Sequence, residues 1–358
     1  MSRRWKFGLV GVGRGSGYGR LVASDPQCEI VGCCDRSQEA LARFQEELGL
    51  PDGRCFTDYD DFVSSVAMDA VFVGTPIPFH AEQTVTAVEA GINVLSEVTA
   101  AATLEECRRI VEAVRRTGRI YMLAENCCFW PFILEWQKMV RAGRLGEIYY
   151  SECEYLHPIP ELIVDPETGE HLWRAERPPL HYCSHSLGPI LEITQDRITR
   201  AMGLGQGHRM MPDPPVLGAI DIQVALFETE KQAIIKLARS SVLARHPAIH
   251  YYTLQGTKGF VETDRLGPTE GLLYVQGEME RAQRIKVSYV DESLPAKARA
   301  GGHGTAEYGV LQAFLRALET GEKPALDEVR AMDLCVPGLI AHESATKGGV
   351  WMEVPSLA

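Results

Sequence analysis

The first third of the chain alternates between short apolar runs and longer stretches whose apolar residues recur at helical spacing. Three of the runs have the length of a buried strand: Lys6–Val10, Glu29–Cys34 and Ala70–Gly74. After the second run, Leu41, Phe44 and Leu48 recur with the period of a helix. Ser37 precedes them and Gly49 follows them, and these residue types commonly begin and end helices. The pattern predicts right-handed βαβ units in a doubly wound α/β fold.

The alternation continues to residue 124 and then gives way to a strand-rich pattern. Thr103 and Glu106 have the spacing of a capping box, which predicts a helix that ends before Gly118. Later strands with alternating apolar and polar residues are expected at 147–155, 220–228, 233–238, 250–255 and 272–275, with a short final strand at 350–354. Such alternation is typical of an antiparallel sheet with one covered face. We expect a parallel α/β domain at 1–124 and a mostly antiparallel α/β domain at 125–358.

Composition narrows the functional classes. The formal net charge is −12 with no basic stretch, which argues against nucleic acid as a partner. No apolar run reaches the length of a membrane-spanning helix, and no signal peptide is evident, so we expect a cytoplasmic protein. The ten cysteines are scattered without a C-x-x-C pair, which predicts free thiols and no metal site.

A glycine-rich turn follows the first predicted strand. Gly11 and Gly13, on either side of Val12, have the spacing with which a backbone turn approaches a pyrophosphate at a helix N-terminus. Ser16 replaces the third glycine of that motif, and the following helix is expected at about 17–24. A glycine turn without a ligand is the alternative, so further signals are needed.

Asp35 supplies one such signal. It ends the second predicted strand about 20 residues on, where an acid binds the ribose hydroxyls of NAD. The alternative is a helix cap, and neighbouring Arg36 leaves room for NADP, since an arginine can bind a 2′-phosphate.

Polar residues also follow the next predicted strands. Thr75 and Pro76 end one strand and Glu97 ends another, so they should border one crevice at the carboxyl ends of the parallel strands. His80 either belongs to that crevice or is an ordinary residue at a helix start.

These segments, together with AGINVLSE, LGEI, GGHG and the closing SATKGGVWMEVP, resemble the Gfo/Idh/MocA oxidoreductases over nearly the whole chain. The resemblance implies NAD(P) in the first domain and, in the second, a large open sheet that builds oligomers. We therefore expect NAD as cofactor and a homo-oligomer, a dimer or a tetramer. The family's usual Glu-Lys-Pro reads Glu97-Val98-Thr99 here, which puts a lysine-based dehydrogenase in doubt.

The altered positions are similar to segments of family 109 glycoside hydrolases, which share the fold and keep NAD bound. The similar segments are EVTAAAT, AEN at Ala124–Asn126, EYLHP, LWR and HSLGP. The second of these adds Asn126 to the expected cofactor contacts. The resemblance implies catalytic roles for Tyr155, Tyr182 and His185, and the segment HYCSHSLG departs from the oxidoreductases by having His181 and Gly188 at acidic positions.

The chemistry of these residues agrees with that implication. Loss of a hydride from a carbinol carbon requires loss of the hydroxyl proton, for which histidine is suited near neutral pH. Tyr182 and His185 lie three residues apart, so on a helical turn they would share a face. A packed tyrosine and a structural histidine are the alternative.

Trp173 and Arg174 are candidate substrate contacts. An indole can stack on a sugar ring while an arginine donates to hydroxyls or a carboxylate. The alternative is a loop that tryptophan anchors. Three functions therefore stay open: an NAD-dependent oxidoreductase acting on a carbohydrate (sugar, polyol or glycoside), a redox-neutral NAD-dependent glycosidase, and a non-catalytic sensor of sugar or cofactor.

Overall fold

The computed structural model describes residues 4–213, 215–267 and 269–358, and it divides into two compact units. Unit 1 comprises residues 1–129, 290–332 and 357–358, and unit 2 comprises 130–289 and 333–356. The division expected at residue 124 differs from this one, because residues 290–332 return to unit 1. Across the described residues, no helix has the length and apolar character needed to cross a membrane.

Unit 1 is built on a six-stranded sheet in the order β3-β2-β1-β4-β5-β6, and all of its pairings are parallel. Its strands are β1 (Trp5–Val10), β2 (Cys28–Cys34), β3 (Cys55–Phe56), β4 (Ala70–Val73), β5 (Asn93–Ser96) and β6 (Tyr121–Leu123). The doubly wound parallel sheet expected from the hydrophobic pattern is therefore confirmed.

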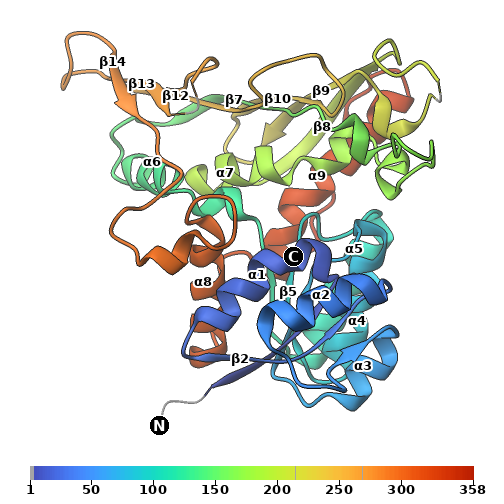
Figure 1. Ribbon diagram of the computed structural model, residues 1–358. Coiled ribbons are helices and arrows are strands. Elements are labelled where there is room, and N and C mark those ends of the chain that lie inside the picture. The colour runs from blue at the N-terminus through green and yellow to red at the C-terminus, as the bar shows by residue number, and fades with distance from the viewer. Residues whose placement is uncertain (1–3, 214, 268) are drawn as a thin grey trace. The chain divides into compact units, whose positions relative to one another are not determined.

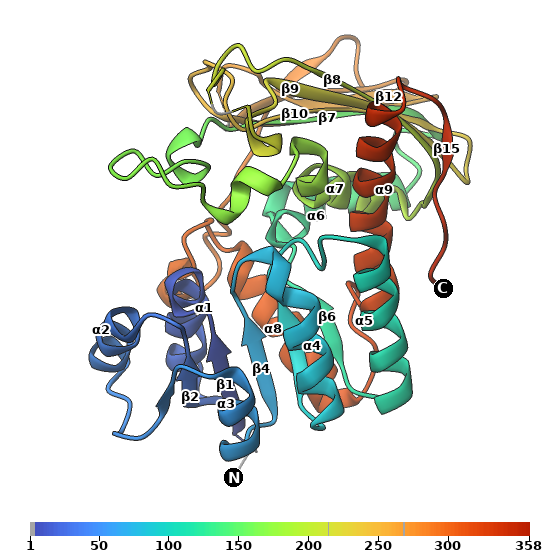
Figure 2. The same ribbon diagram turned by 90° about the vertical axis from the view of Figure 1, so that its right-hand side faces the viewer.

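Helices cover both faces of this sheet (Figures 1 and 2). One face carries α1 (Val12–Ser24), α2 (Gln38–Leu48) and α8 (Ala306–Thr320), and the other carries α3 (Tyr59–Ser65), α4 (His80–Glu89) and α5 (Leu104–Thr117). Side chains alternate along β1 accordingly: the Phe7 ring meets Phe314 of α8 edge-on, at 6.2 Å between centroids, whereas Gly8 lies against Phe62 of α3.

The helix ends largely follow the sequence signals. The Ser37 side chain caps α2, Gly49 ends it in the left-handed conformation, and Thr103 and Glu106 form the expected capping box of α5. The start of α1 is a correction, because it begins at Val12, five residues before the expected Gly17. Glycines disfavour a helix in a free chain, but packing of α1 against the sheet outweighs this propensity.

Unit 2 contains a nine-stranded sheet in the order β14-β13-β12-β11-β7-β10-β9-β8-β15. Among the described residues of this sheet, only the β7–β10 pair is parallel, which confirms the mostly antiparallel sheet. Its strands are β7 (Ile148–Leu156), β8 (Ile198–Gln206), β9 (Ile222–Thr229), β10 (Ile234–Ser240), β11 (Ile249–Gly256), β12 (Gly259–Thr263), β13 (Glu270–Val275), β14 (Gln283–Lys286) and β15 (Met352–Glu353).

The helices α6 (Pro131–Arg141) and α7 (Ser184–Thr194) pack together beneath one face of this sheet, which we call the inner face (Figure 2). Helix α9 (Glu328–Thr346) begins in unit 1 and continues in unit 2. In this unit the hydrophobic pattern missed β8, β12, β14 and α7. Gly203 and Gly205 interrupt the pattern of β8, and Gly188 and Pro189 that of α7.

All ten cysteines are free and nine are buried, in agreement with the sequence. Burial is the main cause that raises the pKa of the Cys28 and Cys34 thiols to about 12.

Candidate active site

The carboxyl ends of the parallel strands in unit 1 gather the residues that the sequence singled out. Gly11 follows β1, Asp35 follows β2, Thr75 lies beyond β4, Glu97 follows β5 and Asn126 lies beyond β6. Strand order reverses between β1 and β4, and ligands of doubly wound folds bind at such switch points. The predicted cofactor residues therefore share one edge of the sheet.

The turn at Gly11 fits a dinucleotide. Gly11 has φ +80°, and a Cβ there would lie 2.5 Å from the backbone of Gly74 and Thr75, so no larger residue is accommodated. Gly13 is exposed, and a Cβ there would have no atom within 4 Å. The N-cap residue Gly11 offers no side chain to α1, and the first turn of the helix lacks acidic residues. The Val12 amide donates to the Asp35 carboxylate, so the amides that follow it are those expected to bind a pyrophosphate.

Asp35 joins the glycine turn to the end of β2. Its carboxylate accepts hydrogen bonds from the Val12 and Ser37 backbone amides, each at 2.9 Å. It therefore has the local capping role named as the alternative. Each carboxylate oxygen has a second lone pair, so the predicted ribose contact remains compatible with this geometry. Arg36 beside it is exposed.

His80 has a positioning role. Its side chain is fully buried, and its ring nitrogens lie 2.7 Å from the Thr75 carbonyl and 2.8 Å from the Thr99 carbonyl. Burial lowers the pKa of the imidazole, against the opposing effect of the two carbonyls. Because both nitrogens are engaged within the chain, we assign His80 to holding the loops after β4 and β5. Pro76 precedes the short turn that leads into His80.

Helix α1 approaches another loop that sequence reasoning left without a role. A Cβ at Gly17 would lie 2.7 Å from the Gly301 carbonyl, so this contact requires glycine. In the same GGHG loop, the His303 side chain bonds to the buried Glu307 carboxylate at the start of α8. Gly17, one residue beyond Ser16, therefore permits the close approach of α1 to this loop.

In unit 2, the three predicted catalytic residues lie together. Tyr182 ends a short 3₁₀ helix (Pro179–Tyr182), and its hydroxyl lies 3.3 Å from Nε2 of His185 in the first turn of α7. Tyr155, from the inner face of β7, has its ring centroid 6.4 Å from that of Tyr182 and 5.7 Å from that of His185. A second tyrosine–histidine pair joins Tyr155 to His157, with 2.9 Å between the hydroxyl and Nδ1.

The predicted substrate contacts belong to the same cluster. Trp173 and Arg174 begin another 3₁₀ helix (Trp173–Glu176), and both are half-buried. The Arg174 guanidinium lies 4.3 Å from the centroid of the Trp173 ring, and that of Arg177 lies 5.7 Å from it. Stacking of a sugar on this indole remains a prediction.

Sequence reasoning missed three members of this cluster: Arg177, Arg239 and His250. The sheet register brings two of them to Tyr155, since Tyr155 pairs with Arg239 of β10 and with His250 of β11. The His250 ring stacks on that of Tyr155, at 4.0 Å between centroids. No local motif marks Arg239 and His250, and only the strand pairing could have found these two.

His181 lies next to this cluster. Its ring contacts that of His342 in α9, at 4.9 Å between centroids. Burial, followed by the charges of His342 and Arg177, lowers its pKa from 6.5 to about 3.

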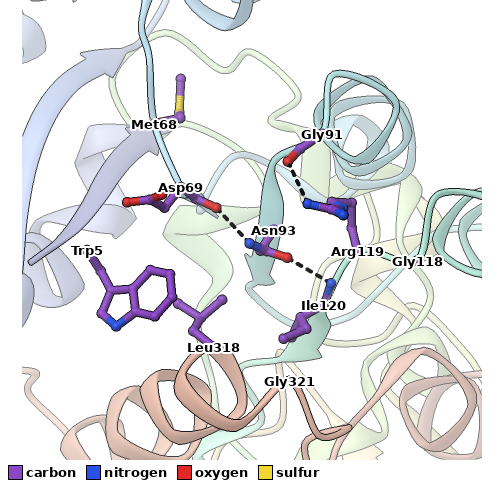
Figure 3. A pocket seen from close by; sticks show the side chains of 10 residues that line it. All are labelled: Trp5, Met68, Asp69, Gly91, Asn93, Gly118, Arg119, Ile120, Leu318 and Gly321. Carbon is purple, nitrogen blue, oxygen red and sulfur yellow. Dashed lines mark hydrogen bonds between the residues drawn. The ribbon is translucent and has the colours of Figure 1, made fainter. Parts of the chain in front are cut away.

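A cavity of about 320 Å³ also lies in unit 1, at the opposite end of its sheet (Figure 3). Asp69 precedes β4, Asn93 begins β5 and Ile120 precedes β6, so the cavity borders the amino ends of the strands. Asn93 donates to the Asp69 carbonyl at 2.8 Å and accepts from the Ile120 amide at 2.9 Å. These groups are paired with one another, and the cavity lies away from the glycine turn, so we do not assign it the active site.

The fold and the glycine turn define a dinucleotide-binding oxidoreductase, and comparison with known proteins agrees. Residues 5–125 match the model of the oxidoreductase family with an NAD-binding Rossmann fold, and residues 185–354 match the C-terminal α/β domain of the same family. The chain belongs to the Gfo/Idh/MocA oxidoreductases, and its cofactor is NAD.

Curated relatives bear a more specific name. The chain is 26% identical to a glycosyl hydrolase family 109 protein of Streptomyces filamentosus, covering 98% of this chain and 76% of the relative. It is also 26% identical to a protein of the same name from Shewanella pealeana, covering 95% and 82%.

Solved structures share the fold. An oxidoreductase domain protein from Kribbella flavida has a TM-score of 0.84 at 22% identity, covering 99% of this chain and 100% of the other. Scyllo-inositol dehydrogenase from Lactobacillus casei, solved with NAD(H) and scyllo-inositol, has a TM-score of 0.77 at 19% identity, covering 98% and 99%.

The position of Asp35 predicts a preference for NAD(H) over NADP(H). A carboxylate there repels a 2′-phosphate and accepts from ribose hydroxyls. Calorimetric titration should show tighter binding of NAD(H), and Asp35→Ala should weaken it. Tighter binding of NADP(H) by the unaltered protein would contradict this role.

The buried state of His181 predicts an acid-sensitive fold. Because its pKa in the folded protein is about 3, whereas the unfolded histidine titrates near 6.5, the unfolded chain binds one more proton between these values. The free energy of unfolding should therefore fall with decreasing pH in this window, by about 1.4 kcal/mol per pH unit from this group. The free energy of unfolding, measured by urea denaturation at several pH values from 4 to 6.5, should depend less steeply on pH for His181→Asn than for the unaltered protein. The matched variant His171→Asn, at an exposed histidine, should keep the pH dependence of the unaltered protein. Equal slopes for all three proteins would refute the assignment.

Proposed function

We propose that the protein is an NAD-dependent oxidoreductase that removes hydride from a hydroxyl-bearing carbon of a carbohydrate: a sugar, a polyol or a glycoside. The Tyr182–His185 pair carries this proposal, because it supplies a proton acceptor to a family member without the usual lysine. Val98, at the position of that lysine, is buried and apolar. A structural neighbour named scyllo-inositol dehydrogenase agrees with this substrate class.

Each residue of the pair has a distinct task. NAD, when bound, accepts the hydride. His185 accepts the proton of the substrate hydroxyl, directly or through the Tyr182 hydroxyl that lies 3.3 Å from its Nε2. His185 is buried with 6% of its surface exposed, which restricts water around the transferred proton.

The Tyr155–His157 pair supports a second candidate function, a redox-neutral glycosidase. After transient oxidation to a ketone, the adjacent carbon becomes acidic, and a second group must remove its proton before the glycosidic bond breaks. Tyr155 and His157 offer that second group, with 2.9 Å between the hydroxyl and Nδ1. The names of the curated relatives also favour this candidate.

Two simultaneous measurements distinguish the candidates. The NAD-loaded protein is incubated with matched free sugars and p-nitrophenyl glycosides, and NADH absorbance and nitrophenol release are both followed. Net NADH indicates the oxidoreductase, whereas nitrophenol without net NADH indicates the glycosidase. Binding of NAD and of a sugar, without formation of NADH or nitrophenol, would indicate the non-catalytic sensor.

Substitution of the proton-handling pair tests its role. His185→Ala and Tyr182→Phe should each lower kcat by about 10²–10⁴, the usual contribution of a positioned acid or base. Affinity for NAD should hardly change, because neither residue lies in unit 1. Both effects are measurable by steady-state kinetics and calorimetry.

Val98→Lys provides the counter-test for this assignment. If Tyr182 and His185 handle the proton, a new lysine should not increase turnover. A more active Val98→Lys protein together with an unaffected His185→Ala protein would reverse the assignment in favour of a lysine-type dehydrogenase.

We also propose a homo-oligomer that covers the outer face of the nine-stranded sheet. Leu204 and Ile234 on this face are 54% and 46% exposed, and Val224 and Leu226 beside them are half-buried. Open apolar sheet faces are commonly covered by a partner. Light scattering should give a multiple of the 39.6 kDa chain mass, and Leu204→Glu combined with Ile234→Glu should reduce it. A monomer of the unaltered protein at all concentrations would disprove the proposal.

A further inference from the structure

Unit 2 contains two buried arginines beside the tyrosines of the candidate active site. Arg177 is 7% exposed and Arg239 is 1% exposed. Neither guanidinium forms an ion pair with a carboxylate among the residues that the structure describes. Buried arginines are rarely left without an acidic partner, because burial of an uncompensated charge is costly.

Their hydrogen-bonding capacity is also largely unused within the described chain. Nε and Nη1 of Arg177 and Nε of Arg239 have no hydrogen-bond partner although they are buried. The recorded bonds of Arg239 run from Nη1 to two backbone carbonyls, those of Tyr155 (3.2 Å) and Ser240. Five N–H donors on each guanidinium are thus served by few acceptors.

The aromatic rings place these cations at the predicted reaction centre. The Arg177 guanidinium lies 4.4 Å from the centroid of the Tyr182 ring, and that of Arg239 lies 4.2 Å from the Tyr155 centroid and 5.9 Å from the Tyr182 centroid. Contacts of this kind stabilise a desolvated cation by about 2 kcal/mol, less than the several kcal/mol that its burial costs.

Guanidinium groups stay protonated in proteins at neutral pH. Burial, followed by the charge of Arg239, lowers the pKa of Arg177 to about 9, and burial lowers that of Arg239. Two positive charges therefore lie near each other with unused donors, beside the indole of Trp173.

We propose that Arg177 and Arg239 form a receptor for an anionic oxygen group of the carbohydrate substrate, a carboxylate or a sulfate ester. An oxyanion would accept the free N–H donors and neutralise the repulsion between the guanidiniums. This inference rests on the proposed carbohydrate-directed function and specifies it: the substrate is an acidic sugar. The Tyr182–His185 pair would then act on a hydroxyl of the sugar that this anchor holds.

The test compares charged and neutral sugars of the same configuration. The NAD-loaded full chain is titrated by calorimetry with glucuronate against glucose, galacturonate against galactose, and galactose 6-sulfate against galactose. The acidic member of at least one pair should bind 10-fold or more tightly than its neutral counterpart. Preference for the carboxylates or for the sulfate ester identifies the group. Equal affinity within every pair would overturn the proposal.

Substitution of each arginine tests whether it causes the preference for acidic over neutral sugars. Arg177→Met and Arg239→Met, which keep side-chain length without charge, should each weaken binding of the acidic sugar by about 10- to 100-fold, the range for hydrogen bonds to a charged group. Binding of neutral sugars should change little, and Arg177→Lys should retain part of the preference. The matched control is Arg284→Met on β14, where the side chain is 70% exposed and pairs with Glu270, and it should bind as the unaltered protein does.

Thermal unfolding separates a receptor from a structural role. Without sugar, Arg177→Met should unfold at the same or a higher Tm, because the variant lacks an unpaired buried charge. The acidic sugar should raise the Tm of the unaltered protein by more than it raises that of the variant. A large drop in Tm for both methionine variants, with an undiminished preference for acidic sugars measured well below their unfolding temperatures, would assign the arginines to the fold and overturn the proposal.

The anion receptor and the proposed function can be rejected separately. Tight, arginine-dependent binding of an acidic sugar without NADH or aglycone release keeps the receptor and rejects the proposed function. Turnover of neutral sugars with no advantage for acidic ones keeps the function and rejects the receptor.

Discussion

The candidate active site depends on the register of β7 between its two neighbours. Tyr155 lies opposite Arg239 on one side and opposite His250 on the other, all on the inner face of the sheet. Because side chains alternate between faces, a slip of one residue would move Tyr155 to the outer face and away from α7. The contacts of Tyr155 with Tyr182 and His185 exist only in the observed register.

The two faces of the same strands differ in charge balance. On the outer face, Glu154 pairs with Arg265 and Glu152 pairs with Lys236, so each acid is matched by a base. On the inner face, Arg239 is buried among aromatic rings without an acid. A fold selected for stability alone would pair each buried base with an acid on both faces of the sheet. Buried charged groups without such a partner are characteristic of binding sites.

The cofactor edge of unit 1 follows from a different constraint. Parallel strands place all of their carboxyl ends together, so residues far apart in sequence, such as Asp35 and Glu97, come to share one edge of the sheet. At the switch point, the close approach of Gly11 to Gly74 and Thr75 leaves no room for a side chain. The backbone itself therefore shapes this part of the site.

Local signals in the sequence were sufficient for many helix ends and for the cofactor edge. Ser37, Thr103 and Glu106 act through neighbours within three residues, and the glycine turn acts through its own backbone, so their effects are visible without the fold. The start of α1 at Val12 and the strand β8 were not visible, because tertiary packing overrides the low propensity of their glycines. The Tyr182–His185 pair was within reach, since its members are three residues apart. Arg177, Arg239 and His250 join it only through strand pairing and burial, because the cost of an unpaired charge arises only once the folded chain has removed water from it.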